Sequence, residues 1–255
     1  MQWEKSKVLD FHNDVILVAG GAGEIGAATA ELLASLGGSV HVADIDTERG
    51  AQVLQKLRAY GGQPTFSKVD MTVQSEVDQW VTEVERHHRK IDVAVNTVGW
   101  TRSSNFVEED AEYWRKVLDA NLMSCVYLAH AVIPAMQRAQ YGRIVLMSSL
   151  SGRIGRRYRT MYGAAKAGVI GFSKALAREV AMDGITVNGV APGTTETAMM
   201  RAQGEENTRF ALAGIPIGKI AMPSDQAAAV AFLASRHTSH MTGQTISVDG
   251  GSTMV

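Results

Sequence analysis

The stretch VILVAGGAGEIGAATAELLASLGG, residues 15–38, carries the first structural signal in the chain. A short apolar run, Val15 to Ala19, is followed at once by a turn rich in glycine. An alanine-rich segment, Ala27 to Leu36, comes next and ends at Gly37 and Gly38. This order predicts a buried strand, a tight turn, and a helix that stops at glycine.

Within the turn, GAGEIG at residues 21–26 matches the GxGxxG pattern in the strand-to-helix context that gives it meaning. Glycines let the backbone approach a pyrophosphate, and the helix N-terminus offers free N–H groups and the positive end of its dipole. A tight turn without a nucleotide would use the same residues, so both interpretations stand at this point. The residues predicted to touch a cofactor here are Gly20, Gly23, Glu24, Ile25 and Gly26.

An acidic residue ends the second strand-like run. Asp44 follows Ser39 to Ala43, about 20 residues beyond the glycines, where a carboxylate accepts hydrogen bonds from an adenosine ribose. It would repel a 2′-phosphate, and Ile45 offers no cation in its place, which predicts NAD rather than NADP. Alternatively, Asp44 is the N-cap of the helix beginning at Thr47. Asp70, after the third strand-like run, either contacts adenine or caps a helix.

Strand-like and helix-like segments alternate along the rest of the chain. The pattern predicts an α/β fold: a three-layer, Rossmann-type, doubly wound sheet of about seven mainly parallel strands with helices on both faces. We expect a single domain over residues 1–255, with residues 194–220 as a mobile lid. Ligands bind at the carboxyl ends of such strands, where the polar segments 96–100 and 148–149 lie.

The segment SSLSGRIGRRYRTMYGAAK, residues 148–166, contains a second pattern with chemical content. Tyr162 and Lys166 are spaced so that they share one face of a helix. A nearby ammonium stabilises a phenolate, and a tyrosine tuned in this way exchanges a proton with an alcohol or a carbonyl. A hydroxyl from Ser149 could bind the same oxygen. A packed tyrosine beside a solvated lysine would show the same spacing.

One long helix is expected over residues 109–140, with Asn121 near its middle. Asparagine is a poor helix former among apolar neighbours. Either Asn121 marks a kink whose freed carbonyl binds water, or its side chain bonds to its own backbone.

Composition excludes several classes of function. A net charge of −1 gives no sign of a nucleic acid or an anionic membrane as partner. Cys125, the single cysteine, excludes an internal disulfide and supplies no metal cluster, so we expect no metal and a reducing, cytoplasmic compartment. The segment Met1 to Asp14 is too polar for a signal peptide.

Taken together, these features resemble the short-chain dehydrogenase/reductase family over nearly the whole chain. The resemblance rests on motifs in the family's order: the glycine turn, Asp44, Asp70, Asn96-x-x-Gly99, Asn121, Ser149, Tyr162-x-x-x-Lys166, Pro192-Gly193 with Thr197, and Thr242-Gly243-Gln244 before Val248-Asp249-Gly250-Gly251.

The resemblance implies a role for each matching residue. Tyr162 would be the general acid/base, Lys166 would hold the nicotinamide ribose, Ser149 would orient the substrate oxygen, and Asn121 would hold a water in a proton relay. Further residues implied at the cofactor are Met71, Asn96, Gly99, Pro192, Gly193, Thr195 and Thr197. The resemblance also implies a homotetramer or a homodimer.

Three departures from the family pattern stand out. Ala19 replaces the usual threonine that braces the turn, and Glu24 stands where single-domain members have glycine. The usual NNAG is Asn96-Thr97-Val98-Gly99 here, at the floor under the adenine ribose. The first two departures bear on cofactor affinity.

The substrate is less clearly encoded. Trp100, Ser151 and Met199 are candidate lining residues, since an aromatic ring with methionines suits a ring or an acyl chain. Four arginines lie between Ser149 and Tyr162, and Arg156 is the one we place at the substrate. They favour an anionic handle on the substrate, unless they are solvated or pair across a subunit interface.

These features predict an NAD-dependent oxidoreductase that interconverts a secondary alcohol and a ketone. We expect a ring alcohol, a dihydrodiol or a hydroxyacyl-CoA as its small-molecule substrate. The alternative is an NADPH-dependent 3-oxoacyl-thioester reductase, against which Asp44 argues. A nucleotide-sensing binding protein is a third possibility, but such a protein would be expected to lack Ser149, Tyr162 or Lys166.

Overall fold

Strand β1, Val15–Ala19, lies within a seven-stranded sheet, and every one of its residues is buried. It pairs in parallel with β2, Ser39–Asp44, on one side and with β4, Val93–Asn96, on the other. The computed structural model describes residues 9–202 and 204–254. The remaining strands are β3 (Thr65–Lys68), β5 (Gly142–Met147), β6 (Ile185–Pro192) and β7 (Thr245–Val248).

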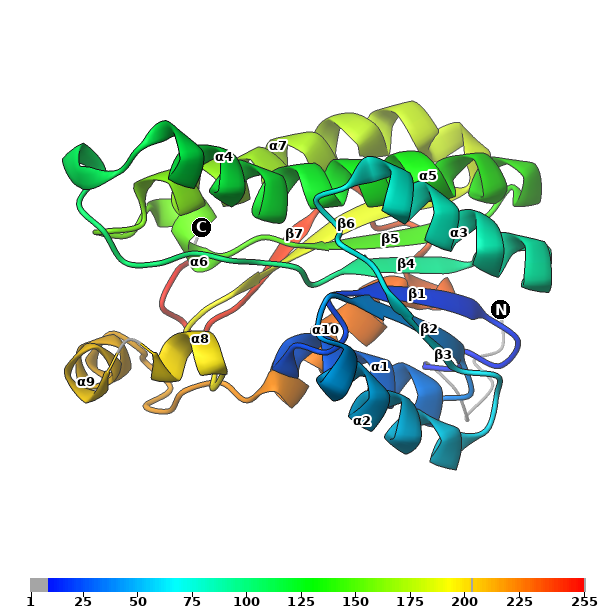
Figure 1. The fold of residues 1–255 in the computed structure, drawn as a ribbon, viewed down its shortest axis with the longest axis horizontal. Helices are drawn as coiled ribbons and strands as arrows, with labels where there is room; N and C mark the ends of the chain where they lie inside the picture. The colour runs from blue at the N-terminus through cyan, green and yellow to red at the C-terminus, as the bar shows by residue number, and fades with distance from the viewer. Residues whose placement is uncertain (1–8, 203, 255) are drawn as a thin grey trace.

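The strand order is β3-β2-β1-β4-β5-β6-β7, and each neighbouring pair is parallel. This confirms the predicted α/β fold. Helices cover both faces of the sheet (Figure 1). One layer contains α1 (Glu24–Ser35), α2 (Thr47–Leu57) and α10 (Pro223–Ala234), and the other contains α3 (Gln74–His88), α5 (Ser124–Ala139) and α7 (Thr160–Val180).

Alternate residues of β1 enter two separate hydrophobic cores. Leu17 and Ala19 belong to the core shared with α3, α5 and α7. Ile16 and Val18 belong to the core shared with α1, α2 and α10. A strand covered on both faces must be apolar at every position, because successive side chains point to opposite faces. This explains why the opening run of the sequence is continuous rather than alternating.

The long helix expected over residues 109–140 is interrupted. Helix α4, Ala111–Leu118, continues through one π-helical turn, Asp119–Met123, into α5. Asn121 lies in this turn, so the expected irregularity is confirmed as a π-bulge. The run Ala111–Ala139 is long and apolar enough to span a membrane by those criteria alone. Here it is a core helix whose apolar residues pack on the sheet.

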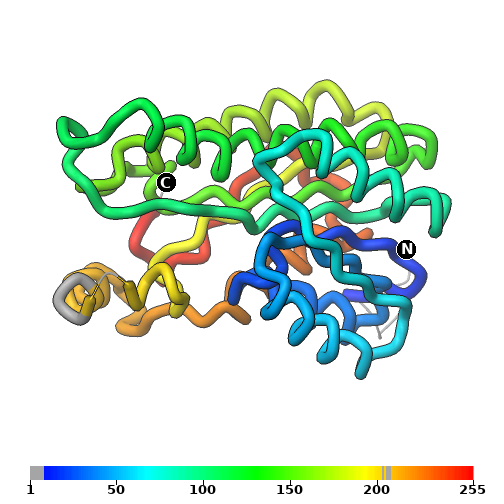
Figure 2. Tube along the Cα trace, in the orientation of Figure 1, coloured from blue at the N-terminus to red at the C-terminus, as the bar shows by residue number. Residues whose placement is uncertain are grey.

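The short helices gather at one end of the sheet. Helix α6, Leu150–Ile154, follows β5, and α8, Ala198–Arg201, follows β6. This is therefore the end where the strands' carboxyl termini lie (Figure 1). Helix α9, Glu205–Ala213, continues the excursion, and Figure 2 shows that the chain from α8 to the start of α10 stands away from the sheet. This is the segment predicted as a lid.

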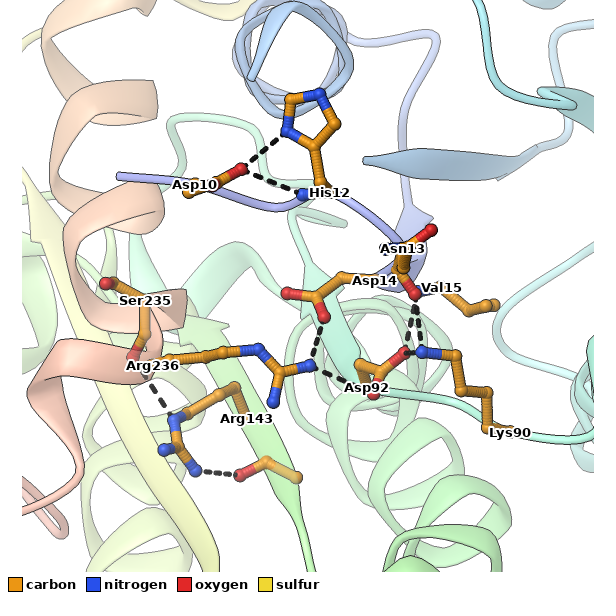
Figure 3. A network of polar contacts seen from close by, with 11 residues as sticks. Asp10, His12, Asn13, Asp14, Val15, Lys90, Asp92, Arg143, Ser235 and Arg236 are labelled. Atoms are coloured by element: carbon orange, nitrogen blue, oxygen red, sulfur yellow. Dashed lines mark hydrogen bonds and ion pairs between the residues drawn. The ribbon is translucent and has the colours of Figure 1, made fainter. Parts of the chain in front are cut away.

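The amino end of the sheet holds a cluster of charged residues (Figure 3). Asp14, just before β1, is fully buried and pairs with Arg236. Asp92, just before β4, accepts from the backbone N–H of Val15 at 2.8 Å and pairs with Lys90 Nζ at 2.8 Å. Arg236 also lies 3.6 Å from Asp92. We call Asp14, Lys90, Asp92 and Arg236 the amino-end ion cluster.

Candidate active site

A cavity of about 270 Å³ opens at the carboxyl ends of β1, β4, β5 and β6. The glycine turn and the first turn of α7 each contribute lining residues, and so does the segment of residues 194–220, which we call the lid segment. The predicted site residues that line it are Gly20, Gly23, Glu24, Ile25, Gly26, Gly99, Ser149, Ser151, Arg156, Tyr162, Lys166, Pro192, Gly193, Thr195, Thr197 and Met199. Segments far apart in the sequence thus meet in one place.

The glycine turn is tight because its backbone folds onto itself. A Cβ atom added to Gly26 would lie 2.2 Å from the carbonyl oxygen of Gly20. Gly20 has φ of +74°, in the left-handed region that glycine adopts readily. Gly23 is the N-cap of α1, and no side chain caps that helix terminus. The first N–H groups of α1 therefore face the cavity without a side-chain acceptor, as an anion site requires.

Thr97 braces this turn, a role that the sequence analysis missed. Its hydroxyl donates to the carbonyl oxygens of Ala19 at 2.8 Å and Gly20 at 3.1 Å. The brace expected to be lost with Ala19 is therefore supplied by the neighbouring strand. No local pattern signals this role, because it follows from the strand pairing that brings Ala19 into register with Asn96, which directly precedes Thr97.

Asp44 lies beside the turn. Its carboxylate accepts from the backbone N–H of Ala22 at 3.0 Å and of Asp46 at 3.0 Å. It does not cap α2, because Asp46 is the N-cap and accepts from the N–H of Arg49. The Asp44 carboxylate is thus fixed at the end of β2, while Ile45 beside it is 63 % exposed.

Five predicted cofactor residues lie outside the lining of the cavity: Asp44, Ile45, Asp70, Met71 and Asn96, of which the first four belong to the side of the glycine turn and β3. Asp70 accepts from both the N–H and the hydroxyl of Thr72, and it does not cap α3, whose N-cap is Val73. Met71 is buried in the core of the α3 face. Their predicted contacts with the adenosine half of a cofactor remain predictions.

Ser149, Tyr162 and Lys166 come together at the centre of the cavity wall. Ser149 is the N-cap of α6, and its Oγ accepts from the N–H of Ser151 at 3.1 Å. Its own hydroxyl proton is therefore free to point elsewhere. Lys166 is 2 % exposed, and its Nζ donates to the carbonyl oxygens of Met147 at 2.8 Å and Val98 at 3.3 Å. One N–H of the ammonium remains for a third partner.

Lys166 Nζ also lies 5.8 Å from the centroid of the Tyr162 ring. The two residues share a face of α7, as their spacing predicted. The buried ammonium is held by backbone carbonyls rather than by a carboxylate. Its full charge thus acts on the cavity beside the tyrosine, which suits stabilisation of a phenolate.

Asn121 is buried behind this wall and does not line the cavity. Its Nδ2 donates to the carbonyl oxygens of Val117 at 2.8 Å and Trp100 at 2.7 Å, and its Oδ1 accepts from the Trp100 N–H at 3.2 Å. Bonding to its own helix backbone is therefore confirmed. A Cβ on Gly99 would lie 3.3 Å from Asn121 Oδ1 and 3.6 Å from Lys166 Nζ. A side chain at position 99 would therefore crowd Asn121, while its contact with Lys166 would be an ordinary one.

Asn96 is likewise buried behind the cavity rather than lining it. Its Oδ1 accepts from the N–H of Val98 at 2.8 Å, and its Nδ2 donates to Ser124 Oγ at 3.3 Å. In this position Asn96 shapes the loop that carries the backbone carbonyl bonded to Lys166.

The expectation that Trp100 borders the cavity is not met. Its ring packs at 5.7 Å from the ring of Tyr113, edge to face, and the ammonium of Lys116 lies 4.2 Å above it. Both main-chain polar groups of Trp100 are bonded to Asn121. The apolar ring therefore fills the space between α4 and the site wall, and helps to hold Asn121.

Arg159 is a lining residue that the predicted site omitted, although it belongs to the arginine cluster noted in the sequence. Burial lowers its pKa, and the nearby Tyr162 and Tyr113 oppose that shift. Its Nη1 is inaccessible and has no hydrogen-bond partner among residues 9–202 and 204–254. Arg156 lines the same side of the cavity. Two guanidinium groups thus face the space next to Tyr162.

A sequence profile described as "Enoyl-(Acyl carrier protein) reductase" matches residues 20–253. The chain is similar to the 3-oxoacyl-[acyl-carrier-protein] reductase FabG of Escherichia coli K12, at 37% identity over 247 residues, or 97% of this chain and 100% of the relative. It is also similar to FabG of Chlamydia muridarum, at 39% identity over 240 residues, covering 94% and 97%.

Two solved structures share the fold. A short-chain type dehydrogenase/reductase from Mycobacterium ulcerans superposes with a TM-score of 0.92 at 28% identity, covering 96% of this chain and 91% of that one. The protein gox2181 superposes with a TM-score of 0.92 at 32% identity, covering 96% and 97%.

Proposed function

The chain belongs to the short-chain dehydrogenase/reductase family, and on that premise we propose that it interconverts a 3-oxoacyl thioester and the 3-hydroxyacyl thioester with NAD(H). It is an oxidoreductase, and its family implies a nicotinamide cofactor. The single observation that carries the proposed hydride-transfer chemistry is the meeting of Ser149, Tyr162 and Lys166 with the glycine turn in one cavity.

The proton chemistry belongs to the protein. Tyr162 gives its phenolic proton to the substrate oxygen during reduction and takes it back during oxidation. Ser149 donates its hydroxyl proton to the same oxygen, while one of its lone pairs accepts from the N–H of Ser151. The Lys166 ammonium stabilises the phenolate that remains. The Asn121 side chain is hydrogen-bonded to the backbone of Trp100 and so positions the wall behind these groups. The proposal includes Asn121 as the residue that holds a water in a proton relay.

A nicotinamide dinucleotide fits the residues around the glycine turn. The uncapped N-terminus of α1 offers donors to its diphosphate, and the third N–H of Lys166 offers a donor to a ribose hydroxyl. When bound, the cofactor supplies or accepts the hydride. Gly193, Thr195 and Thr197 line the opposite wall, where the nicotinamide end would lie.

The preference for NAD rests on Asp44. Two backbone N–H groups fix its carboxylate beside the glycine turn, and the adjacent Ile45 brings no cation to receive a 2′-phosphate. A fixed carboxylate both binds ribose hydroxyls and repels a phosphate.

The similar proteins favour a thioester over a ring alcohol or a dihydrodiol as the substrate. The similar proteins from Escherichia coli and Chlamydia muridarum are named as 3-oxoacyl-[acyl-carrier-protein] reductases and match along nearly the whole chain. They favour the thioester that the sequence analysis held as its alternative over a ring alcohol or dihydrodiol. Arg156 and Arg159 suit such a substrate, because guanidinium N–H groups bind carbonyl, carboxylate or phosphate oxygens.

Two further expectations belong to the proposal. A homotetramer or homodimer is expected by family resemblance. A cytoplasmic location is expected from the single cysteine, Cys125, which is buried and free.

The test begins with the purified chain and a short 3-oxoacyl-CoA, offered with NADH and, separately, with NADPH. Turnover with NADH, and little with cyclohexanone, supports the proposal. Turnover of cyclohexanone alone would return the ring-alcohol interpretation to the front. Binding of neither nucleotide in a calorimetric titration would overturn a nicotinamide-dependent function.

Cofactor preference is tested separately with Asp44→Asn, which keeps the size of the side chain and removes its charge. The ratio of NADH to NADPH affinity should fall about tenfold, the equivalent of one charge-assisted hydrogen bond. Asp46→Asn, two residues along and exposed, is the matched control and should leave the ratio unchanged. An unchanged ratio in Asp44→Asn would remove the argument for NAD.

A further inference from the structure

Glu24 is the first residue of α1, at the position where single-domain family members carry glycine. Its carboxylate reaches across the cavity mouth to the lid. Both of its oxygens accept from the backbone N–H of Ala198, the first residue of α8, at 3.1 Å. A carboxylate at a helix N-terminus satisfies an otherwise free donor and complements the helix dipole.

Arg201, at the other end of α8, completes the contact. One of its terminal nitrogens donates to Glu24 Oε1, and the other donates to Glu196 Oε1 at 2.9 Å. The N–H and guanidinium groups outweigh partial burial and lower the pKa of Glu24, so its carboxylate stays ionised. We call Glu24 and Arg201 the lid latch.

The latch lies where the diphosphate of the cofactor would bind. Glu24, Ile25 and Gly26 line the cavity with their N-terminal helix donors uncapped by any side chain. A diphosphate at these donors would place its negative charge beside the Glu24 carboxylate. The Arg201 side chain, about half exposed and contacting Glu24, is already within reach of the same helix terminus.

We propose that Arg201 is a diphosphate-binding residue that is paired with Glu24 in the free protein. When the dinucleotide binds, Arg201 exchanges the Glu24 carboxylate for the diphosphate and keeps α8 over the cofactor. Glu24 then acts as a positioning residue whose charge weakens cofactor binding while it holds the lid in the free protein. The inference rests on the proposed dinucleotide site and adds to it a residue on the lid.

Calorimetric titration with NADH and with ADP-ribose tests the exchange, because both ligands carry the diphosphate. Arg201→Ala should weaken the binding of both by about tenfold, as expected for the loss of a hydrogen bond to a charged group. The matched control is Arg209→Ala, an exposed arginine on α9 that, unlike Arg201, is not paired with Glu24 among the described residues, and it should leave both affinities unchanged. Glu24→Gln should tighten both by about threefold, because like charge is removed beside the diphosphate.

The result that overturns the proposal is equal affinity of Arg201→Ala and the parent protein. Equal weakening in Arg209→Ala would also overturn it, because the effect would then come from the positive charge of the lid segment in general. Weaker binding of the two ligands by Glu24→Gln would overturn it as well. None of these outcomes depends on turnover. If the parent binds neither ligand, the proposed function fails as well, whereas a parent that binds with an unaffected Arg201→Ala overturns the exchange alone.

The contact between Glu24 and Arg201 in the free protein is tested without any nucleotide by limited trypsin digestion. Cleavage after Arg201 should be faster in Glu24→Gln than in the parent, since the guanidinium loses its carboxylate partner. Cleavage after Lys219, exposed on the same lid segment, serves as the internal reference. Equal cleavage rates after Arg201 in both proteins would overturn the latch.

Discussion

The two ends of the same sheet differ in how their buried charged groups are partnered. At the amino end, Asp14 and Asp92 are buried and meet Lys90 and Arg236 in direct ion pairs (Figure 3). At the carboxyl end, the hydrogen-bond partners of the buried Lys166 ammonium among the described residues are two backbone carbonyls. Arg159 at that end also retains a buried nitrogen without a partner among the described residues.

The difference follows from where a parallel sheet leaves its groups free. Helices that begin at the carboxyl ends of strands point their N-termini there, so donors converge on that edge and await an acceptor. Charges at the opposite edge meet no such demand and can be paired within the protein. We therefore expect changes at the carboxyl end to affect chemistry, and changes at the amino end to affect stability.

The largest expected effect is the loss of the proton donor at the carboxyl end. Tyr162→Phe should lower kcat about 10³-fold, within the range for removal of a general acid. Its melting temperature should stay close to that of the parent, because the phenolic hydroxyl faces the cavity rather than the core. Steady-state kinetics and circular dichroism melting measure the two quantities.

Tyr158→Phe is the control for that change, since Tyr158 lies on the same segment but outside the cavity lining. It should leave kcat unaltered. A Tyr162→Phe protein that keeps a tenth of the parent activity would contradict the assignment of the proton donor.

Removing a cation from the amino-end ion cluster should give the reverse result. Arg236→Ala leaves the fully buried Asp14 without its ion-pair partner and should cost about 2 kcal/mol, discounted because Arg236 is half exposed. Urea unfolding should show this loss, while kcat and KM at 25 °C remain those of the parent. Arg138→Ala, which breaks the exposed pair with Glu85, is the control and should cost less than about 0.5 kcal/mol. A fall in kcat for Arg236→Ala in the folded protein would break the separation of the two ends.

A third prediction concerns pH. His41 on β2 is 1 % exposed, bonded to Thr65 Oγ1 at 2.8 Å, and packed at 4.6 Å against the ring of His88. Burial, and then the nearby His88, lower its pKa from 6.5 to about 3. Between pH 6.5 and about 3, His41 is therefore protonated in the unfolded chain and neutral in the folded protein. Stability is full above pH 6.5 and falls progressively as the pH drops toward 3.

Urea unfolding at several pH values checks this dependence. The parent should lose about 1.4 kcal/mol from this group for each pH unit below the unfolded value. His41→Asn should show a flatter profile, and His130→Asn, on the exposed side of α5, should keep the slope of the parent. A parent profile that is flat over this window would show that His41 is not held neutral by burial.

The smallest expected effect is the loss of a single threonine hydroxyl, which is compared between the two ends of the sheet. Thr97→Val removes the brace of the glycine turn and should weaken NADH binding about threefold and cost about 1 kcal/mol of stability. Thr186→Val, near the start of β6, removes a buried hydroxyl that has no hydrogen-bond partner among the described residues. That change should be neutral or stabilising and should not affect NADH binding. Equal effects of the two substitutions would contradict a special role for Thr97.

Local patterns in the chain predicted more of the fold than of the site. The bounds predicted for β1 are those observed, because a continuous apolar run between turn signals has few other solutions. The Tyr162 and Lys166 pair was found from its spacing, which is a property of one helix. Asn121 was found as an irregularity because its residue type conflicts with its neighbours.

The parts that could not be predicted join segments distant in the chain. The Asp14 pair with Arg236 spans 222 residues, and the Arg201 contact with Glu24 spans 177. Trp100 offered a plausible pocket residue by its type, but its packing against Tyr113 was decided by the path of α4.

By itself, the sequence determined the parallel α/β architecture, the glycine turn, and the helix face that carries Tyr162 and Lys166. These depend on periodicity, turn chemistry and short spacings, which act within about one supersecondary unit. Only the tertiary structure decided that Thr97 braces the turn, that Glu24 meets the lid segment, and that Asp14 and Asp92 pair with cations at the amino end of the sheet. Those outcomes depend on which strands become neighbours, and non-local pairing is not written in any single stretch of the chain.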